Sequence, residues 1–299
     1  MAEGSRPAAE VPIDAGLVRR LLTSQFPQWS RLPVNPVESA GWDNAIYRLG
    51  ADLAVRLPRR RIGADQTEKE HQWLPALGPQ LPLAVPVPIG KGRPGEGYPW
   101  HWTVCPWLPG DVAALAPVAD IRQTAICLAR FVRAVQAIDP EGGPVGKFRG
   151  VPLAARDPIS RASIEALRGS LDVLRLLAAW EAVVAAPEWT GPPVWMHGDL
   201  HPANLLVRNG VLAGVIDFGL LGVGDPACDL MVAWTYLSAG ARQVFRDALA
   251  VDDATWARGR GWALHLGLGA AAYSGDNPVL GSIGRYTIGE VLADSGQSR

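Results

Sequence analysis

The stretch that decides the fold reads VWMHGDLHPAN at Val194–Asn204, and thirteen residues after its asparagine comes DFG at Asp217–Gly219. Phosphoryl transfer asks a protein for metal ions on the β- and γ-phosphates and for a carboxylate that accepts the proton of the attacking hydroxyl. Asp199 is the candidate for that carboxylate, Asn204 and Asp217 are the candidate metal ligands, and His197 is expected to orient the loop. The order and spacing of these residues favour this interpretation over a plain turn residue, strand cap and second turn.

The sequence between the two motifs predicts a β-hairpin. Strand-like runs at Leu205–Arg208 and Val211–Ile216 flank Asn209-Gly210, a pair that accepts the positive φ angles of a tight primed turn. Such a hairpin places Asn204 and Asp217 at neighbouring strand ends. Their side chains are then expected to point into one volume.

Composition points to an ordinary globular protein with a small partner. The 299 residues are 48% hydrophobic and their formal net charge is −1, which offers no field for nucleic acid or an anionic membrane. Residues 1–10 lack an apolar run, so we expect a loose tail there and neither a signal peptide nor a membrane span. Three widely spaced cysteines suggest reduced thiols in the cytoplasm, and the oligomeric state stays open.

The chain divides into a strand-rich beginning and a helix-rich remainder. Leu53–Leu57 has the length and composition of a strand, and apolar spacing predicts a helix over Asp65–Leu77 with Glu70 on its inward face. Another strand is expected within Tyr98–Leu108, and Pro109-Gly110 marks a hinge. We therefore predict two domains, residues 1–108 and 109–299.

The motifs resemble the aminoglycoside phosphotransferase and choline kinase superfamily, most specifically over Val194–Leu230 and more loosely over Glu38–Leu108. The resemblance implies a protein-kinase-like, two-lobed α+β fold. Its small, mainly antiparallel β N-terminal lobe would bind the nucleotide and carry one helix. Its larger helical C-terminal lobe would carry the catalytic loop, the hairpin and the acceptor site.

The resemblance also implies chemistry. It points to a kinase that uses Mg²⁺ and moves phosphate from ATP or GTP to a hydroxyl of an aminoglycoside-like antibiotic, giving antibiotic resistance. A macrolide or other antibiotic, a choline-like amine and a sugar stay open as acceptors. A non-catalytic nucleotide-binding pseudokinase is the alternative from another class.

Nucleotide-binding residues follow from the resemblance with two departures. Arg56 occupies the strand position where kinases carry a phosphate-binding lysine, and Glu70 would pair with it, unless Arg56 is a surface arginine. No glycine-rich loop precedes that strand, and the turn from Ser39 to Asn44 stands in its place, either capping phosphates or forming a plain hairpin turn. The base is expected against the backbone at Cys105, Trp107 and Leu108.

Two other kinds of protein are excluded by order along the chain. The run GKGRPG at Gly90–Gly95 matches a dinucleotide fingerprint in letters only, because it contains a proline and leads into a strand rather than a helix. A protein kinase carries its Ala-Pro-Glu triplet after Asp-Phe-Gly, whereas Ala186–Glu188 precedes the catalytic loop. With five residues between Gly219 and Asp225, the acceptor is expected to be a small molecule.

Candidate acceptor residues come last. Asp225 and Asp229 are expected to cap a helix and brace the catalytic loop, with direct substrate contact as the alternative. Trp234 would line the acceptor pocket, although an aromatic residue at helical spacing is more often part of the core. From Asp111 onward, 19 acidic and 16 basic residues leave a net charge of −3, which favours a cationic acceptor slightly.

Overall fold

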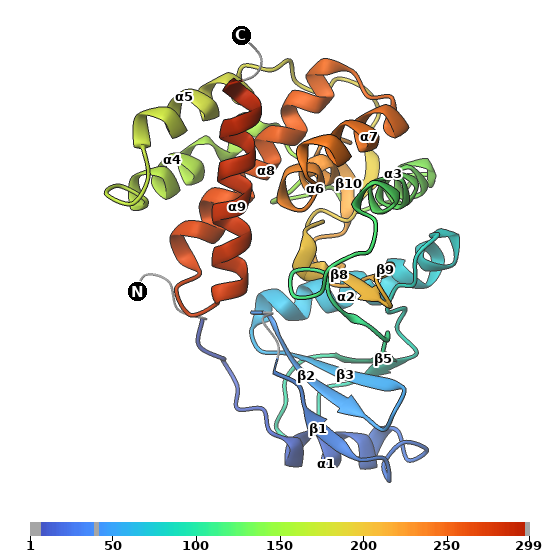
Figure 1. Cartoon of the computed structure of the whole chain (residues 1–299). Coiled ribbons are helices and arrows are strands. Elements are labelled where there is room, and N and C mark those ends of the chain that lie inside the picture. Colours follow the sequence, from blue (N-terminus) through green and yellow to red (C-terminus); the bar gives the residue numbers. More distant parts are fainter. Residues whose placement is uncertain (1–6, 39–41, 297–299) are drawn as a thin grey trace. The chain divides into compact units, whose positions relative to one another are not determined.

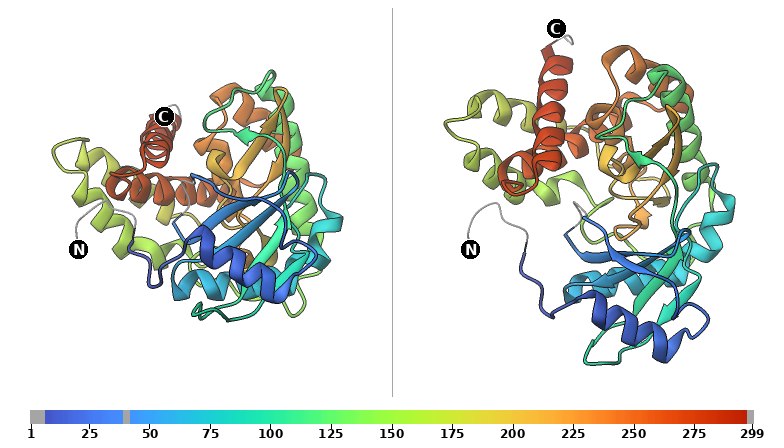
Figure 2. Two further views of the ribbon diagram at one scale, coloured as in Figure 1. Left: turned by 90° about the horizontal axis from the view of Figure 1, so that it is seen from below. Right: turned by 60° about the horizontal axis from the view of Figure 1, so that its bottom comes forward.

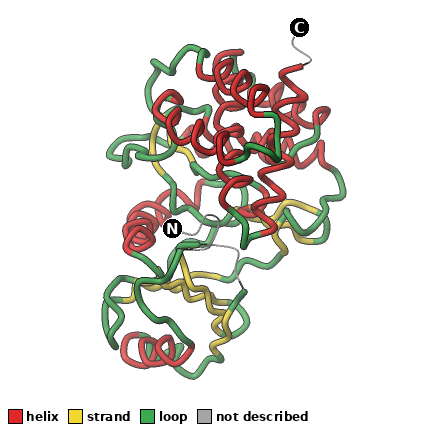
Figure 3. Tube along the Cα trace, turned by 90° about the vertical axis from the view of Figure 1, so that its left-hand side faces the viewer, coloured by secondary structure: helices red, strands yellow, loops and turns green. Residues whose placement is uncertain are grey.

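The computed structural model describes residues 7–38 and 42–296, which fall into two compact units, one up to Pro109 and one from Gly110 onward (Figure 1). The first unit is built on a five-stranded sheet and the second is mainly helical (Figure 3). Among the described residues, none of the helices has the length and apolar character needed to cross a membrane.

The sheet of the first unit is antiparallel throughout, in the order β1-β2-β3-β5-β4. Its strands are β1 (Val34–Pro36), β2 (Asn44–Leu49), β3 (Leu53–Pro58), β4 (Gly90–Gly92) and β5 (Trp102–Pro106). The helices of this unit are α1 (Ala15–Gln25) and α2 (Arg61–Leu77), followed by the 3₁₀ turn η1 (Gly78–Gln80).

Strand alternation assigns the two faces of this sheet. Val55 and Leu57 of β3 join the core with Leu17, Leu21 and other apolar residues of α1. Arg56 points to the other face, where it meets α2. The predicted strand over Leu53–Leu57 is thus confirmed. This central strand directs Arg56 toward α2 and its apolar side chains toward α1.

Two expectations for this unit are wrong. The described part of the unit has two α-helices rather than one, and Asp14 caps the unexpected one, α1, by accepting from the amide of Leu17 at 2.7 Å. The expected loose tail does not extend to Glu10, whose amide donates to the carbonyl of Arg59 at 2.9 Å.

The helical unit carries two small sheets. One is β6-β8-β9, formed by β6 (Asp111–Val112), β8 (Leu205–Arg208) and β9 (Val211–Val215). The other pairs β7 (Val194–Met196) with β10 (Gly222–Gly224). Helices account for most of the rest: α3 (Ile121–Ala137), η2 (Leu153–Arg156), α4 (Asp157–Ala166), α5 (Val173–Val184), η3 (Pro202–Asn204), η4 (Cys228–Met231), α6 (Val232–Thr235), α7 (Ala239–Leu249), α8 (Asp253–Tyr273) and α9 (Pro278–Gly296).

The long helices α8 and α9 pack against each other (Figure 2). Trp262 and Leu264 of α8 and Val291 of α9 are fully buried. The glycines of α8 permit close approach, since a Cβ on Gly267 would lie 3.0 Å from the side chain of Thr287 in α9. This helix pair forms a large part of the core of the unit that holds the catalytic loop.

Candidate active site

The β8–β9 hairpin forms as the sequence predicts. Asn209 and Gly210 have φ angles of 53° and 76°, the left-handed values that a tight primed turn requires. At the open end of the hairpin, Leu205 pairs with Val215, and the amide of Ile216 donates to the carbonyl of Asn204 at 2.9 Å. Asn204 and Asp217 therefore lie at adjacent strand ends.

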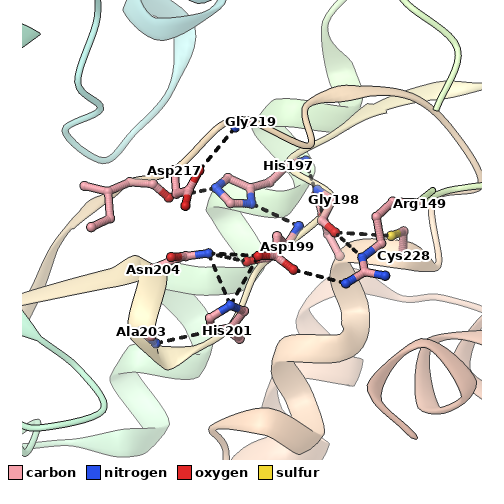
Figure 4. A network of polar contacts seen from close by, with 12 residues as sticks. Arg149, His197, Gly198, Asp199, His201, Ala203, Asn204, Asp217, Gly219 and Cys228 are labelled. Carbon is pink, nitrogen blue, oxygen red and sulfur yellow. Dashed lines mark hydrogen bonds and ion pairs between the residues drawn. The ribbon is translucent and has the colours of Figure 1, made fainter. Parts of the chain in front are cut away.

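Asn204 is joined to Asp199 by hydrogen bonds that fix both side chains. Its Nδ2 donates to the backbone carbonyl of Asp199 at 2.9 Å and to Oδ2 of the carboxylate at 3.3 Å (Figure 4). Because the amide nitrogen is directed at Asp199, the amide oxygen is the atom that Asn204 presents to a cation. The loop from Asp199 to Asn204 closes through the 3₁₀ turn η3, in which the amide of Asn204 donates to the carbonyl of His201.

His197 orients the loop from inside the protein. Its Nε2 donates to the carbonyl of Ile216 at 3.0 Å, so its Nδ1 accepts the backbone N–H of Asp199 at 3.2 Å. The ring is fully buried and meets Phe218 edge-on, with centroids 4.6 Å apart. His197 therefore links the start of the catalytic loop to the end of β9 and is placed to position Asp199.

Asp229 braces the same loop from η4. Its two carboxylate oxygens accept the backbone N–H groups of His197 at 2.7 Å and of Gly198 at 2.8 Å. Gly198 has a φ of 84°, and a Cβ there would lie 2.6 Å from the carbonyl oxygen of Leu220, so only glycine fits. Burial raises the pKa of Asp229 despite these contacts. The bracing role, and not substrate contact, agrees with its complete burial.

The carboxylate of Asp199 is held by two further side chains. Arg149 donates from Nη2 to Oδ1 at 3.3 Å and from Nε to the carbonyl of Gly198 at 2.9 Å, while His201 Nε2 lies 3.3 Å from Oδ2. Burial would raise the pKa of Asp199, but His201, Arg149 and His197 outweigh burial and hold that pKa below its usual range. Asp199 is therefore ionised at neutral pH, the state that a proton acceptor needs.

Arg149 was missed by sequence reasoning. It lies in a loop fifty residues before Asp199 and belongs to no motif, so no local signal points to it. Arg149 reaches Asp199 because two backbone hydrogen bonds fix its loop. The amide of Gly146 donates to the carbonyl of Val223 in β10, and the amide of Asp225, just after β10, donates to the carbonyl of Gly150.

Asp217 and Asn204 have donor chemistry that suits Mg²⁺. Asp217 has a φ of 64°, and its Oδ1 accepts the amide of Gly219 at 3.4 Å. Within residues 7–38 and 42–296, no group of three or more His, Cys, Asp or Glu side chains is arranged to hold a metal. Mg²⁺ bound to a nucleotide typically takes one or two protein oxygens and completes its shell with phosphates and water. One amide oxygen and one carboxylate fit that pattern.

The first unit brings Arg56 and Glu70 together. Arg56 Nη1 and Nη2 donate to the two oxygens of Glu70 at 2.8 and 3.3 Å, a bidentate pair whose side chains are 12% and 2% exposed. Asn44 begins β2 opposite Pro58. Ser39 lies outside the described residues. The amide of Trp107 donates to the carbonyl of Asp52 at 2.8 Å, so that amide is already used within the unit.

Cys105 is the first residue of the segment expected to meet the base. Its thiol is buried in β5, and burial raises its pKa to about 11. The Cys105 backbone pairs with Ala54 of β3. Leu108 follows in a segment outside the strands. These backbone positions stay candidates for base contact, and the Cys105 thiol is unreactive at neutral pH.

Two expectations for the acceptor residues need correction. Trp234 is fully buried, packs on Trp256 with centroids 4.5 Å apart and donates to Asp294 at 3.1 Å, so it has no surface to offer an acceptor. Asp225 forms a buried ion pair with Arg258, at 2.7 Å. Its Oδ1 also accepts the amide of Ala227. The segment after Asp225-Pro226 is a turn followed by the 3₁₀ segment η4, whereas an α-helix capped by Asp225 was expected there.

The fold and this constellation together define a kinase-like phosphotransferase with an alcohol group as acceptor. Comparison with known proteins supports this class and narrows it. The chain belongs to the phosphotransferase enzyme family, whose sequence profile matches residues 36–262. The resemblance to the aminoglycoside phosphotransferase and choline kinase superfamily is therefore confirmed, as is the two-lobed α+β fold.

Relatives in sequence are distant. The homoserine kinase of Granulibacter bethesdensis is 26% identical over 225 residues, which cover 68% of this chain and 66% of that protein, just under two thirds of its length. The aminoglycoside 3'-phosphotransferase of Escherichia coli is 27% identical over 216 residues, covering 64% and 73%.

Solved structures share the fold. The GDP complex of aminoglycoside 2'-phosphotransferase-IIIa aligns with a TM-score of 0.71 at 19% identity, over 95% of this chain and all of that chain. A macrolide 2'-phosphotransferase from Brachybacterium faecium aligns with a TM-score of 0.63 at 23% identity, over 92% and 98%. At such identities the likeness extends to the fold alone.

Proposed function

We propose that this enzyme moves the γ-phosphate of ATP or GTP to a hydroxyl of a small molecule, with Asp199 as the proton acceptor. The observation that carries the proposal is the contact between Asn204 and Asp199. It joins the candidate base to a hairpin whose other strand, β9, ends two residues before Asp217. A protein that only bound nucleotide would have no need of an ionised, precisely braced carboxylate at this place, which argues against a pseudokinase.

In the proposed reaction the acceptor hydroxyl oxygen attacks the γ-phosphorus while its proton passes to Asp199. The bond from that phosphorus to the bridging oxygen breaks, and the nucleoside diphosphate leaves with the electron pair. His197 and Asp229 keep the loop in place during this transfer. Asn204 and Asp217 would hold Mg²⁺, which supplies positive charge to the phosphate oxygens when bound.

The nucleotide is assigned to the first unit and the acceptor to the second. Arg56, fixed by Glu70, would steady the α- and β-phosphates, because a guanidinium binds phosphate well and is always charged. Asn44 and the backbone at Cys105, Trp107 and Leu108 complete the candidate nucleotide site. Relatives described as GDP and ADP complexes agree with a nucleoside triphosphate as donor. We also propose a cytoplasmic location, where nucleoside triphosphates are available.

Two kinds of acceptor deserve testing first. The relatives that act on aminoglycosides and macrolides favour an antibiotic, with resistance as the result. The homoserine kinase relative favours a hydroxyl-bearing metabolite. Choline-like amines and sugars complete the panel.

The test is nucleoside diphosphate release in the presence of Mg²⁺, with ATP or GTP and with each acceptor in turn. We expect release that depends on one acceptor class and requires the metal. Tight nucleotide binding without acceptor-dependent release for any class would favour the pseudokinase and overturn the proposal.

A further inference from the structure

Arg149 contacts the proposed base yet takes no part in the steps given above. It lies in the Arg149 loop, residues 145–150, which is anchored at Gly146 to Val223 of β10 and at Gly150 to Asp225, the residue after β10. Its side chain is 15% exposed and approaches Asp199 from the side opposite Asn204 and His201 (Figure 4). The position of this cation is set by the fold of the helical unit alone.

Counting lone pairs on Asp199 shows where an acceptor hydroxyl can bind. Each carboxylate oxygen accepts about two hydrogen bonds. Oδ2 already faces two donors, Asn204 Nδ2 and His201 Nε2, both at 3.3 Å. His201 carries its proton on Nε2, since its Nδ1 accepts the amide of Ala203. Within residues 7–38 and 42–296, the one side chain that contacts Oδ1 is Arg149, so the reacting hydroxyl is expected at Oδ1, beside the guanidinium.

Arg149 has further hydrogen-bonding capacity. A guanidinium has five N–H donors, and the contacts to Asp199 and Gly198 use two of them. A planar guanidinium can pair with a carboxylate through two parallel hydrogen bonds.

A second arginine, Arg156, acts on the same part of the core as Arg149. Burial, followed by the charges of Arg149 and Arg156, lowers the pKa of His265 to about 3, so both arginines act on the same part of the core. Two carboxylates of this unit are matched by arginines of their own, Asp157 by Arg161 at 2.9 Å and Asp225 by Arg258 at 2.7 Å. Part of the net charge of −3 is thus taken up by ion pairs, and Asp229 beside the catalytic loop is already engaged by the backbone amides of His197 and Gly198.

We propose that Arg149 selects acceptors by charge, and that the group next to the reacting hydroxyl is a carboxylate. The acceptor carboxylate pairs with Arg149 while the hydroxyl donates to Oδ1 of Asp199. Hydroxy acids, hydroxy amino acids and sugar acids have this arrangement, whereas a polycation would bring an ammonium group against the guanidinium. This inference rests on the proposed function and narrows its acceptor.

The experiment compares acceptors that differ only in charge. L-serine, L-threonine, L-homoserine and D-gluconate are each assayed against their primary amides, with kanamycin as the polycation. For the best acceptor we expect kcat/KM to favour the carboxylate over the amide by roughly 10-fold or more. In Arg149→Gln this preference shrinks toward unity, mostly through a rise in KM for the carboxylate, and Arg149→Lys restores part of it.

Arg161→Gln is the matched control, since Arg161 is a partly exposed arginine of the same unit that pairs with Asp157 and Glu181. It should leave the preference unchanged. Thermal unfolding checks that each variant is folded. If Arg149→Gln does not fold, Arg149→Lys is compared with the wild type instead.

Failure of the inference and failure of the proposed function differ in outcome. Turnover that is equal for carboxylate and amide, or confined to kanamycin, overturns the role of Arg149 and leaves the phosphotransferase intact. A carboxylate preference that survives in Arg149→Gln also overturns it. If no acceptor of any charge is phosphorylated while nucleotide binds, the proposed function falls and the inference with it.

Discussion

The Asp229 carboxylate accepts the backbone N–H of His197 at 2.7 Å, and its second oxygen accepts the next amide along the chain. The contact spans 32 residues and lies wholly inside the protein. A side chain that never meets solvent thereby sets the backbone from which Asp199 projects. Asp229→Asn should lower kcat by roughly 100-fold, because one carboxylate oxygen is replaced by an NH₂ facing an N–H donor.

Asp229→Asn should also lower the free energy of unfolding, measured in urea, by about 1–3 kcal/mol. Asp247→Asn provides the comparison, since Asp247 is an exposed residue of the same unit that meets Gln243 at 2.7 Å. An Asp229→Asn enzyme with unchanged kcat would show that the loop holds its shape without this brace.

Asp199→Asn should slow phosphate transfer by roughly 10²- to 10⁴-fold, because the amide cannot accept the hydroxyl proton. The variant keeps the shape of the side chain, so nucleotide affinity should change little. Single-turnover phosphate transfer and nucleotide titration measure the two effects separately. A parallel loss of nucleotide affinity would instead place Asp199 in the nucleotide site.

Asn204→Ala and Asp217→Asn should each raise the Mg²⁺ concentration for half-maximal activity by roughly 10-fold or more, since each removes or weakens one oxygen ligand. Asn204→Ala also frees the carboxylate of Asp199 from a hydrogen bond, so its kcat at saturating Mg²⁺ should fall further than that of Asp217→Asn. Activity measured against Mg²⁺ at fixed nucleotide tests both statements. An unshifted Mg²⁺ dependence in both variants would remove the metal assignment.

Arg56→Met should destabilise the protein by about 3 kcal/mol or more, because it leaves the buried Glu70 carboxylate without this partner. The double variant Arg56→Met with Glu70→Leu should recover much of that loss, since two apolar side chains replace the ion pair. Nucleotide affinity should stay low in both variants. Urea unfolding and nucleotide titration distinguish the outcomes, and a double variant with normal affinity would exclude Arg56 from phosphate binding.

Stability should fall in mild acid because of His265. Its Nδ1 lies 2.9 Å from Ser160 Oγ, and burial holds its folded-state pKa at about 3, below the usual value of 6.5. The unfolded chain therefore binds a proton that the folded protein does not, and stability declines as pH drops through 6.5 toward 3. At pH 5 this one group should reduce the free energy of unfolding by about 2 kcal/mol relative to neutral pH.

His265→Gln should remove that part of the pH dependence. The matched comparison is His101→Gln, since His101 is 38% exposed. Urea unfolding at neutral pH and at pH 5 measures the slope, and an equal slope in wild type and His265→Gln would contradict the assignment.

Sequence predicts the parts of this site that depend on neighbours along the chain. The hairpin follows from two short apolar runs and from two turn residues between them that accept positive φ. The α1 helix also carried a local signal, Asp14 before Leu17, Val18, Leu21 and Leu22, but the prediction of a single helix overlooked it.

The rest depends on packing between distant segments. Arg149 reaches Asp199 because its loop is tied to β10, and Arg258 reaches Asp225 across 33 residues. Neither pairing leaves a pattern in the sequence. Trp234 shows the same limit in reverse, because helical spacing alone does not say whether an aromatic side chain faces a pocket or the interior.

The two candidate metal ligands stand at the open end of one hairpin, with Asn209 at the far tip. Their separation is thus dictated by ladder register and is insensitive to how many residues form the tip. Evolution, or a protein engineer, can lengthen or tag that tip without respacing the pair, provided that the contact from Ala119 to Gly210 is kept. A one-residue slip of the ladder, by contrast, would part them at once.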